Sequence, residues 1–150
     1  MNGKNIFIKM VYSMAYRLVD FKTNGDTRGS LIALEENYNI PFAIKRVYYI
    51  FDTKESVIRG YHAHVNLKQM AIAVKGSCTF ILDNGKIREE IKLDNPNQGL
   101  LIEGLIWREM KDFSEDCVLV VLASEYYDEN DYIRDYQKFI DMVLENETIK

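Results

Sequence analysis

The stretch that decides the fold is "QMAIAVKGSCTFILDNGKIREEIKL", residues 69–93. It contains three short runs rich in apolar and β-branched residues, separated by the turn signals "KG" and "DNG". Asn84-Gly85 favours the tight turn of a hairpin, because both residues tolerate the positive φ that such a turn needs. The stretch therefore predicts three consecutive antiparallel strands.

The same pattern continues on both sides of this stretch. Short runs of strand-forming residues alternate with turn signals such as "DNPNQG" from about residue 31 to residue 123. Regular alternation of this kind is typical of a β-sandwich or a small barrel. We therefore expect an all-β fold with strands over residues 31–35, 43–51, 57–64, 69–74, 77–82, 86–93, 99–104, 106–113 and 117–123.

The hydrophobic period changes after Ala123. Apolar residues then recur at helical spacing, namely Tyr132, Ile133, Tyr136, Phe139, Ile140, Val143 and Leu144. Asp128 or Asn130 can cap the start of such a helix. The pattern predicts a C-terminal α-helix over residues 128–146 that packs on the outside of the barrel, and its aromatic stripe is interpreted as packing rather than as a binding site.

The length of 150 residues suits one domain with a single core. We expect an N-terminal extension over residues 1–24, the barrel over residues 25–125 and then the helix.

Composition argues against several classes of function. The net charge of −4 argues against a broad nucleic-acid surface, which needs clustered positive charge. No run approaches the roughly 18 apolar residues of a membrane span, and the N-terminus lacks a signal-peptide cleavage site. Cys78 and Cys117 lie in apolar runs, and two lone cysteines form neither a zinc pattern nor a disulfide framework. We expect a soluble, cytoplasmic protein without nucleic-acid or membrane partners.

Both histidines of the chain lie in "RGYHAH", residues 59–64. Residues two apart in a strand point to the same face, so His62 and His64 would project side by side. The pair is compatible with a metal site, with two proton-transfer groups, or with two structural histidines. Neutral histidines are common proton-transfer groups near pH 7, which favours the second interpretation.

The spacing from this pair to Gln69 and then to Gly76 resembles the first motif of the cupins, which implies a jelly-roll, or double-stranded β-helix, barrel. Gln69 stands where that motif places a metal-binding glutamate. A third histidine is absent from the chain, and the resemblance places Arg108 near the position where one would lie. A fixed cation repels a metal ion, so we expect neither a metal nor another cofactor.

A closer resemblance rests on "RGSLIALEENYNIPFAIKRVYYIFDTK", "RGYHAH", "GSCTFILDNG" and "WREMKDFSEDCVLVVLASEYYDENDYIRDYQKFI". Together these segments are similar to the dTDP-sugar 3,4-ketoisomerases, the WxcM-like branch of the cupins. The resemblance implies that the ketone of dTDP-4-keto-6-deoxy-D-glucose moves from carbon 4 to carbon 3. It also implies a role in making 3-amino-3,6-dideoxyhexoses for surface polysaccharide, with His62 and His64 as the proton-transfer pair.

Several arginines and one tyrosine are candidates for substrate binding. Arginine binds phosphate through planar, often bidentate contacts, so Arg46, Tyr48 and Arg59 are expected to hold the nucleotide. The resemblance links Arg28 and Arg108 to the configuration at carbon 4 of the product. The "RGSL" segment resembles relatives of the galactose type, whereas Arg108 resembles those of the glucose type, and the rest of the N-terminal half favours galactose.

The family resemblance further implies a homodimer whose N-terminal strands are exchanged between subunits. The apolar segment from Phe7 to Phe21 is compatible with an element that needs a partner surface. Two other functions stay open at this point. They are a dTDP-4-keto-sugar 3,5-epimerase, which also starts by removing a proton beside the 4-ketone, and a non-catalytic sugar-binding cupin.

Overall fold

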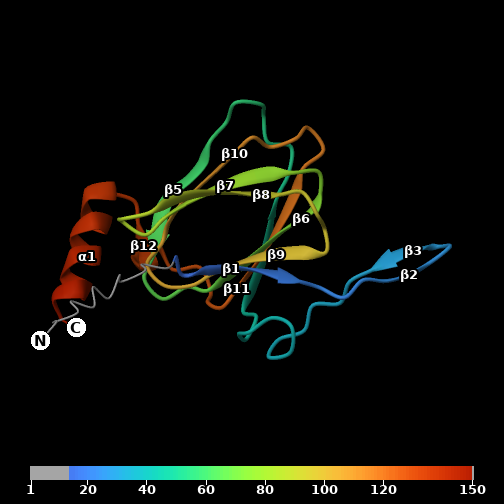
Figure 1. Cartoon of the computed structure of the whole chain (residues 1–150), viewed down its shortest axis with the longest axis horizontal. Coiled ribbons are helices and arrows are strands. Elements are labelled where there is room, and N and C mark those ends of the chain that lie inside the picture. The colour runs from blue at the N-terminus through green and yellow to red at the C-terminus, as the bar shows by residue number, and fades with distance from the viewer. Residues whose placement is uncertain (1–13, 150) are drawn as a thin grey trace, which may run out of the picture.

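The computed structural model describes residues 14–149, in which two five-stranded antiparallel sheets face each other and a helix covers one of them (Figure 1). The first sheet has the order β1-β9-β6-β11-β4, and the second has the order β12-β5-β10-β7-β8. Strands of the first sheet are β1 (Tyr16–Asp20), β4 (Arg46–Ile50), β6 (Gln69–Lys75), β9 (Gln98–Ile102) and β11 (Val118–Ala123). Those of the second are β5 (Arg59–His64), β7 (Cys78–Asp83), β8 (Arg88–Leu93), β10 (Trp107–Lys111) and β12 (Tyr132–Ile133).

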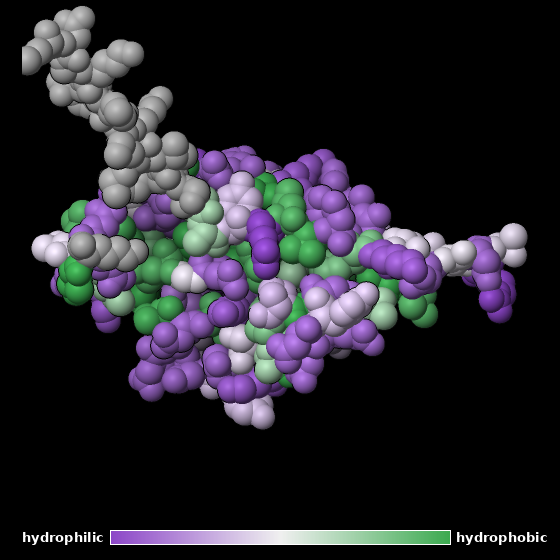
Figure 2. All heavy atoms as spheres, turned by 60° about the horizontal axis from the view of Figure 1, so that its bottom comes forward, coloured by the Kyte–Doolittle hydropathy of each residue, from purple (hydrophilic) through white to green (hydrophobic). Residues whose placement is uncertain are grey.

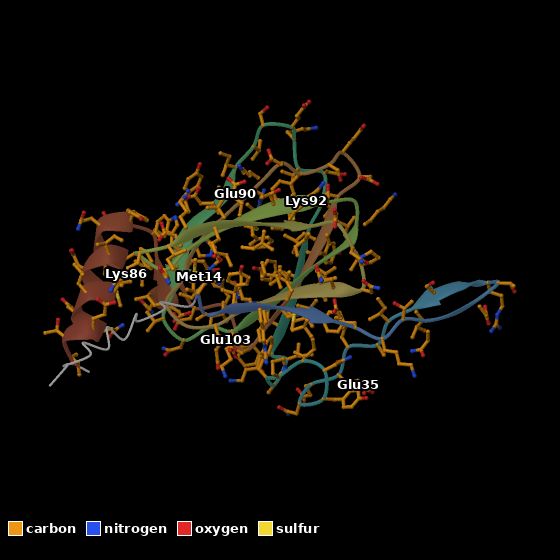
Figure 3. All side chains as sticks on the ribbon, in the orientation of Figure 1. Met14, Glu35, Lys86, Glu90, Lys92 and Glu103 are labelled. Atoms are coloured by element: carbon orange, nitrogen blue, oxygen red, sulfur yellow. The ribbon has the colours of Figure 1, made fainter. Side chains whose placement is uncertain are left out.

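The main core lies between the two sheets, where alternate residues of each strand point inward. Side chains fill this space in Figure 3. The cluster comprises Ala71, Ala73, Cys78, Phe80, Leu82, Ile91, Leu93, Leu100, Ile102, Ile106, Met110, Phe113, Cys117, Leu119 and Val121. The arrangement confirms the predicted all-β jelly-roll fold with a C-terminal helix.

The helix α1 (Tyr136–Thr148) begins later than predicted. Its N-cap is Asp135, whose side chain accepts a hydrogen bond from the backbone N–H of Lys138. Phe139 is fully buried against Trp107 and Ile133 on the outer face of the second sheet. The predicted packing on the outside of the barrel is thus confirmed.

The first part of the predicted helix is not helical. Asp128 caps a short 3₁₀ helix (Glu129–Asp131), and Tyr132 and Ile133 form β12. This strand pairs with β5, with Tyr132 opposite His64. The prediction over residues 128–135 was wrong because β5 offers an open edge, and pairing with it overrides the helical pattern of the sequence.

The N-terminal region also departs from the prediction. β1 lies inside the expected extension, yet it pairs with β9 of the same chain. The strand expected over residues 31–35 is absent from the structure except for Leu31, which ends the hairpin of β2 (Asn24–Asp26) and β3 (Gly29–Leu31). Ile32 and Leu34 instead contribute to a second cluster on the outer face of the first sheet, around Ile40 and Phe42.

Residues 1–13, which include the first part of the segment expected to be exchanged between subunits, lie outside the described part of the chain. Between residues 14 and 149, no helix has the length and apolar character needed to cross a membrane.

Candidate active site

Strand alternation places four polar side chains in the space between the sheets. On β10, Arg108 lies between two core residues that point inward, Ile106 and Met110, and it pairs directly with His62 of β5. On β6 and β4, Gln69 and Tyr48 occupy positions equivalent to their inward-facing neighbours. Residues opposite one another in an antiparallel pair share a face, so the imidazole of His62 and the guanidinium of Arg108 lie on the inner side of the second sheet.

A β-bulge precedes the histidines. Gly60 lies opposite Glu109 and His62 lies opposite Arg108, which leaves Tyr61 as an extra residue in β5. Gly60 and Tyr61 have φ values of 96° and 55°, and a Cβ on Gly60 would lie 2.7 Å from the carbonyl oxygen of Arg108. Glycine is therefore required here both for its conformation and for the close approach of β10.

The two histidine rings lie edge to face with their centroids 4.8 Å apart. His64 is 1% exposed, and His62 is less deeply buried. Burial, followed by the positive charge of Arg108, lowers the pKa of His62 to about 4 and that of His64 to about 2. Both imidazoles are therefore neutral near pH 7 and can each accept or donate a proton.

Arg108 is the cation at the centre of the site and is 2% exposed. Its Nη1 donates to Oε1 of Gln69, and its Nε and Nη2 donate to the carbonyl oxygen of Ile106 at 3.3 and 2.9 Å. Nε2 of Gln69 in turn donates to the hydroxyl oxygen of Tyr48 at 2.9 Å. Burial lowers the pKa of Arg108 to about 10, so it stays charged at neutral pH.

The same contacts explain why Gln69 is not poised to bind a metal. Its only acceptor atom, Oε1, already receives a hydrogen bond from a guanidinium. Within residues 14–149, no three histidine, cysteine, aspartate or glutamate side chains gather in a geometry that could hold a metal ion.

A hollow of about 490 Å³ opens beside the histidines; we call it the tyrosine hollow. Its lining consists of Arg46, Asn66, Leu67, Glu125, Tyr126, Tyr127, Asp128, Asp131 and Tyr132. The Arg46 guanidinium lies 5.5 Å from the ring centroid of Tyr48 and 5.6 Å from that of Tyr127, within cation–π distance. Arg46 is thus the one predicted phosphate-binding arginine that lines this hollow.

Two residues of the segment before α1 separate the tyrosine hollow from the histidines. The ring of Tyr132 lies 5.0 Å from that of His62 and 4.3 Å from that of His64, measured between centroids. A carboxylate oxygen of Asp131 lies 3.0 Å from Nδ1 of His64. Two neutral imidazoles, a buried cation and a tyrosine-lined hollow together suit proton transfer on a polar substrate.

Comparison with known proteins agrees with this geometry. The sequence pattern of the family described as "FdtA: WxcM-like, C-terminal" matches residues 14–144. This chain belongs to the FdtA family. The TDP-4-oxo-6-deoxy-alpha-D-glucose-3,4-oxoisomerase of Aneurinibacillus thermoaerophilus is 57% identical over 126 residues, which cover 84% of this chain and 91% of that relative.

Solved structures similar to this FdtA-family chain include two 3,4-ketoisomerases. QdtA from Thermoanaerobacterium thermosaccharolyticum, crystallised with TDP, is 46% identical, with a TM-score of 0.87 over 91% of this chain and 98% of its own. WlaRB, a TDP-quinovose 3,4-ketoisomerase from Campylobacter jejuni, is 51% identical, with a TM-score of 0.81 over 84% of this chain and 97% of its own. These likenesses confirm the predicted family and fold.

The FdtA-family chain does not bring every predicted site residue together. The structure brings together His62, His64, Gln69, Tyr48, Arg108 and Arg46. Arg59 is exposed at the start of β5, ahead of the bulge, and does not line the tyrosine hollow. Arg28 lies on the turn of the β2–β3 hairpin, where its side chain is 88% exposed and bound to Asp26.

Sequence reasoning missed Asp131 and Tyr132, the residues through which the family's C-terminal segment enters the site. The helical spacing predicts Tyr132 to be part of a packing stripe on a helix, whereas its ring contacts both histidines. The available signal was Asp135, a good N-cap close to the true start of the helix. It would have placed Asp131 and Tyr132 in a separate segment.

Proposed function

We propose that this chain is a sugar 3,4-ketoisomerase that converts dTDP-4-keto-6-deoxy-D-glucose to a dTDP-3-keto-6-deoxyhexose. The observation that carries the proposal is the pair of neutral imidazoles beside the uncompensated cation of Arg108. The activity named for the relative that is 57% identical over most of both chains supports the same reaction.

The proposed reaction needs proton transfers only. A base removes the proton from carbon 3, and the ketone oxygen on carbon 4 gains a proton, which gives an enediol. The hydroxyl on carbon 3 then loses its proton as carbon 4 gains one, which leaves the ketone at carbon 3. His62 and His64 serve as the proton-transfer groups, and the cation of Arg108 stabilises negative charge that develops on the enediol oxygens.

We assign the tyrosine hollow to the nucleotide end of the substrate. A volume of about 490 Å³ falls in the range of small-molecule sites, and Arg46 brings a cation suited to a diphosphate. Asp131 and Tyr132 line this hollow and also contact the histidines, so only these two residues lie between the proposed nucleotide site and the imidazoles. Gln69, which is itself bonded to Tyr48, holds Arg108 in place behind them.

We also propose a homodimer in which the β2–β3 hairpin lies against the second subunit. All six residues of the hairpin strands are exposed, and the hairpin projects from the body of the chain in Figures 1 and 2. A two-stranded hairpin without a packed face is only marginally stable in water. Exchange of this element would bring Arg28 to a site on the partner, which would account for its distance from the histidines of its own chain.

The proposed dimer contact is tested by placing a charged side chain on the β2–β3 hairpin. Leu31, which is 61% exposed, should become part of the interface, so Leu31→Asp should yield a monomer in sedimentation analysis. Leu144→Asp is the matched control, because Leu144 is 55% exposed on α1 and lies outside the proposed interface. Equal masses for both variants and the unmodified chain would contradict the proposed contact.

The galactose configuration at carbon 4 stays a prediction. Arg28 in the "RGSL" segment supports it, while Arg108 and the similarity to a TDP-quinovose enzyme support the glucose configuration. Coupling constants of the proton on carbon 4 of the product distinguish the two directly.

Proton NMR of the product formed from dTDP-4-keto-6-deoxyglucose in deuterated water tests the reaction itself. A ketoisomerase moves the ketone to carbon 3 and places deuterium on carbon 4. An epimerase would leave the ketone at carbon 4 and exchange the protons on carbons 3 and 5. Substrate that binds and stays unchanged would indicate a non-catalytic sugar-binding cupin, and either of the last two results would refute the proposal.

A further inference from the structure

The carboxylate of Asp131 is fixed at both of its oxygens by the end of β5. Oδ2 lies 3.0 Å from Nδ1 of His64, and Oδ1 accepts a hydrogen bond from the backbone N–H of Asn66 at 3.0 Å. The backbone oxygen of Asp131 also accepts from the N–H of Val65. Two side-chain contacts and one backbone contact, with three consecutive residues, thus hold Asp131 in one orientation relative to the imidazole.

The chemistry of the pair determines which nitrogen of His64 carries the proton. A neutral imidazole has one N–H, and an ionised carboxylate can only accept hydrogen bonds. Nδ1 must therefore be the protonated nitrogen, donating to Asp131. Nε2 then keeps its lone pair, and this atom is buried without a hydrogen-bond partner among the described residues.

We propose that Asp131 is a positioning residue that holds His64 in the Nδ1–H tautomer, so that Nε2 faces the reaction as the proton-accepting nitrogen. This inference rests on the proposed proton-transfer role of His64. It goes beyond that role because it names the nitrogen that reacts and the residue that selects it. The pairing of β12 with β5, with Tyr132 opposite His64, brings Asp131 to the ring.

Asp131→Asn is the decisive variant because it changes the hydrogen-bond pattern with little change in shape. The oxygen of the new amide keeps the bond from the N–H of Asn66, so its NH₂ group faces Nδ1 of His64. An NH₂ donor requires a lone pair on Nδ1, and the proton of the imidazole therefore moves to Nε2. We expect kcat to fall about 10²- to 10⁴-fold, while KM changes little, because the acceptor nitrogen is lost.

Long-range proton–nitrogen NMR of the His64 ring reads the tautomer independently of activity. The unmodified chain should show Nδ1 protonated, Asp131→Asn should show Nε2 protonated, and Asp131→Glu should retain the first pattern with part of the activity. Asp135→Asn is the matched control, since asparagine also caps helices and the residue lies outside the site. Its tautomer and kcat should equal those of the unmodified chain.

Two results would overturn the proposal. One is an unmodified chain in which Nε2 of His64 carries the proton. The other is an Asp131→Asn variant with a lower melting temperature but an unchanged tautomer, which would make Asp131 a structural anchor only. A variant whose tautomer changes while turnover is retained would support the positioning role and would instead refute the proposed role of His64 in proton transfer.

Discussion

Arg108 and Glu109 are neighbours on β10, both charged and both buried, but they point to opposite faces of the sheet. Glu109 accepts hydrogen bonds from Nη2 of Arg88 at 3.0 and 3.1 Å and from Nε1 of Trp107 at 3.0 Å. Arg108 donates to the neutral oxygens of Gln69 and Ile106, and no carboxylate within residues 14–149 forms an ion pair with it. The outer charge thus forms an ion pair with a neighbouring side chain, and among the described residues the inner charge does not.

This difference in ion pairing indicates that the two faces of β10 have different roles. An uncompensated buried charge costs stability, so its presence needs another explanation. Here its field adds to the effect of burial, which is the larger cause, in lowering the pKa of His62 and of His64, and so helps to keep the two proposed proton-transfer groups neutral. We therefore expect substitutions on the inner face to change chemistry, and substitutions on the outer face to change stability.

The largest effect is expected from the histidines themselves. His62→Asn and His64→Asn should each lower kcat about 10²- to 10⁴-fold, because each removes a proposed proton-transfer group. Melting temperatures should change little, since asparagine fills a similar space. Conversion of the sugar nucleotide is followed by NMR, and near-normal turnover in either variant would show that the inner face does not carry the chemistry.

The next effect is a loss of stability in mild acid. The folded pKa values of His62 and His64, about 4 and about 2, lie below the ordinary value of 6.5. Below pH 6.5 the unfolded chain therefore binds protons that the folded chain does not, and the free energy of unfolding falls as the pH drops. At pH 5 the expected loss is about 2 kcal/mol for each histidine.

Urea unfolding at pH 7 and pH 5 measures this loss. A chain carrying both His62→Asn and His64→Asn serves as the control and should show a much smaller change between the two pH values. Equal losses in the two chains would mean that the inner-face histidines are not held neutral.

On the outer face, Glu109→Ala should lower the free energy of unfolding by about 1–3 kcal/mol, because Trp107 loses its acceptor in a buried setting. Turnover of the folded protein should stay close to that of the unmodified chain. Glu90→Ala is the matched control: Glu90 is 58% exposed and pairs with Lys111, and exposed pairs contribute about 0–1 kcal/mol. A large loss of turnover in Glu109→Ala would break the separation between the two faces.

The smallest effect is expected when a carboxylate is placed beside the buried positive charge of Arg108. Gln69→Glu places a carboxylate next to the guanidinium of Arg108 and should raise the pKa of His62 by about 1 unit, toward its ordinary value. NMR titration of the histidine ring measures the shift. Gln137→Glu adds the same charge on the exposed side of α1 and should leave that pKa unchanged. A Gln69→Glu variant without a shift would contradict the role assigned to the uncompensated cation.

Much of the inner face follows from the sequence because strand alternation is a local rule. It places His62 beside His64 and Arg46 beside Tyr48, and the cupin spacing adds Gln69. The predicted sugar 3,4-ketoisomerase activity agrees with the names of the similar proteins. The cytoplasmic location stays a prediction.

What the sequence could not reveal depends on contacts between distant segments. Asp131 and Tyr132 reach the site because β12 pairs with β5. The spacing of Tyr132 relative to the apolar residues that follow predicts a helix there, so the sequence pattern did not indicate this strand pairing. Arg59 is separated from the histidines by the bulge at Tyr61, which alternation cannot anticipate. The family resemblance links Arg28 and Arg108 to the same feature of the product, yet Arg28 lies on a projecting hairpin and Arg108 is buried between the sheets.

The docking of α1 has a consequence for motion at the site. Ile133, one residue from the ring that covers the histidines, is packed against Phe139 of the helix, and β12 itself is only two residues long. So short a strand forms few backbone hydrogen bonds with β5, so the docked helix adds to the contacts of Asp131 in holding it there. We expect the amide hydrogens of β12 to exchange with solvent faster in a chain whose α1 is destabilised. The element farthest along the chain thus helps to determine how long the two imidazoles stay covered.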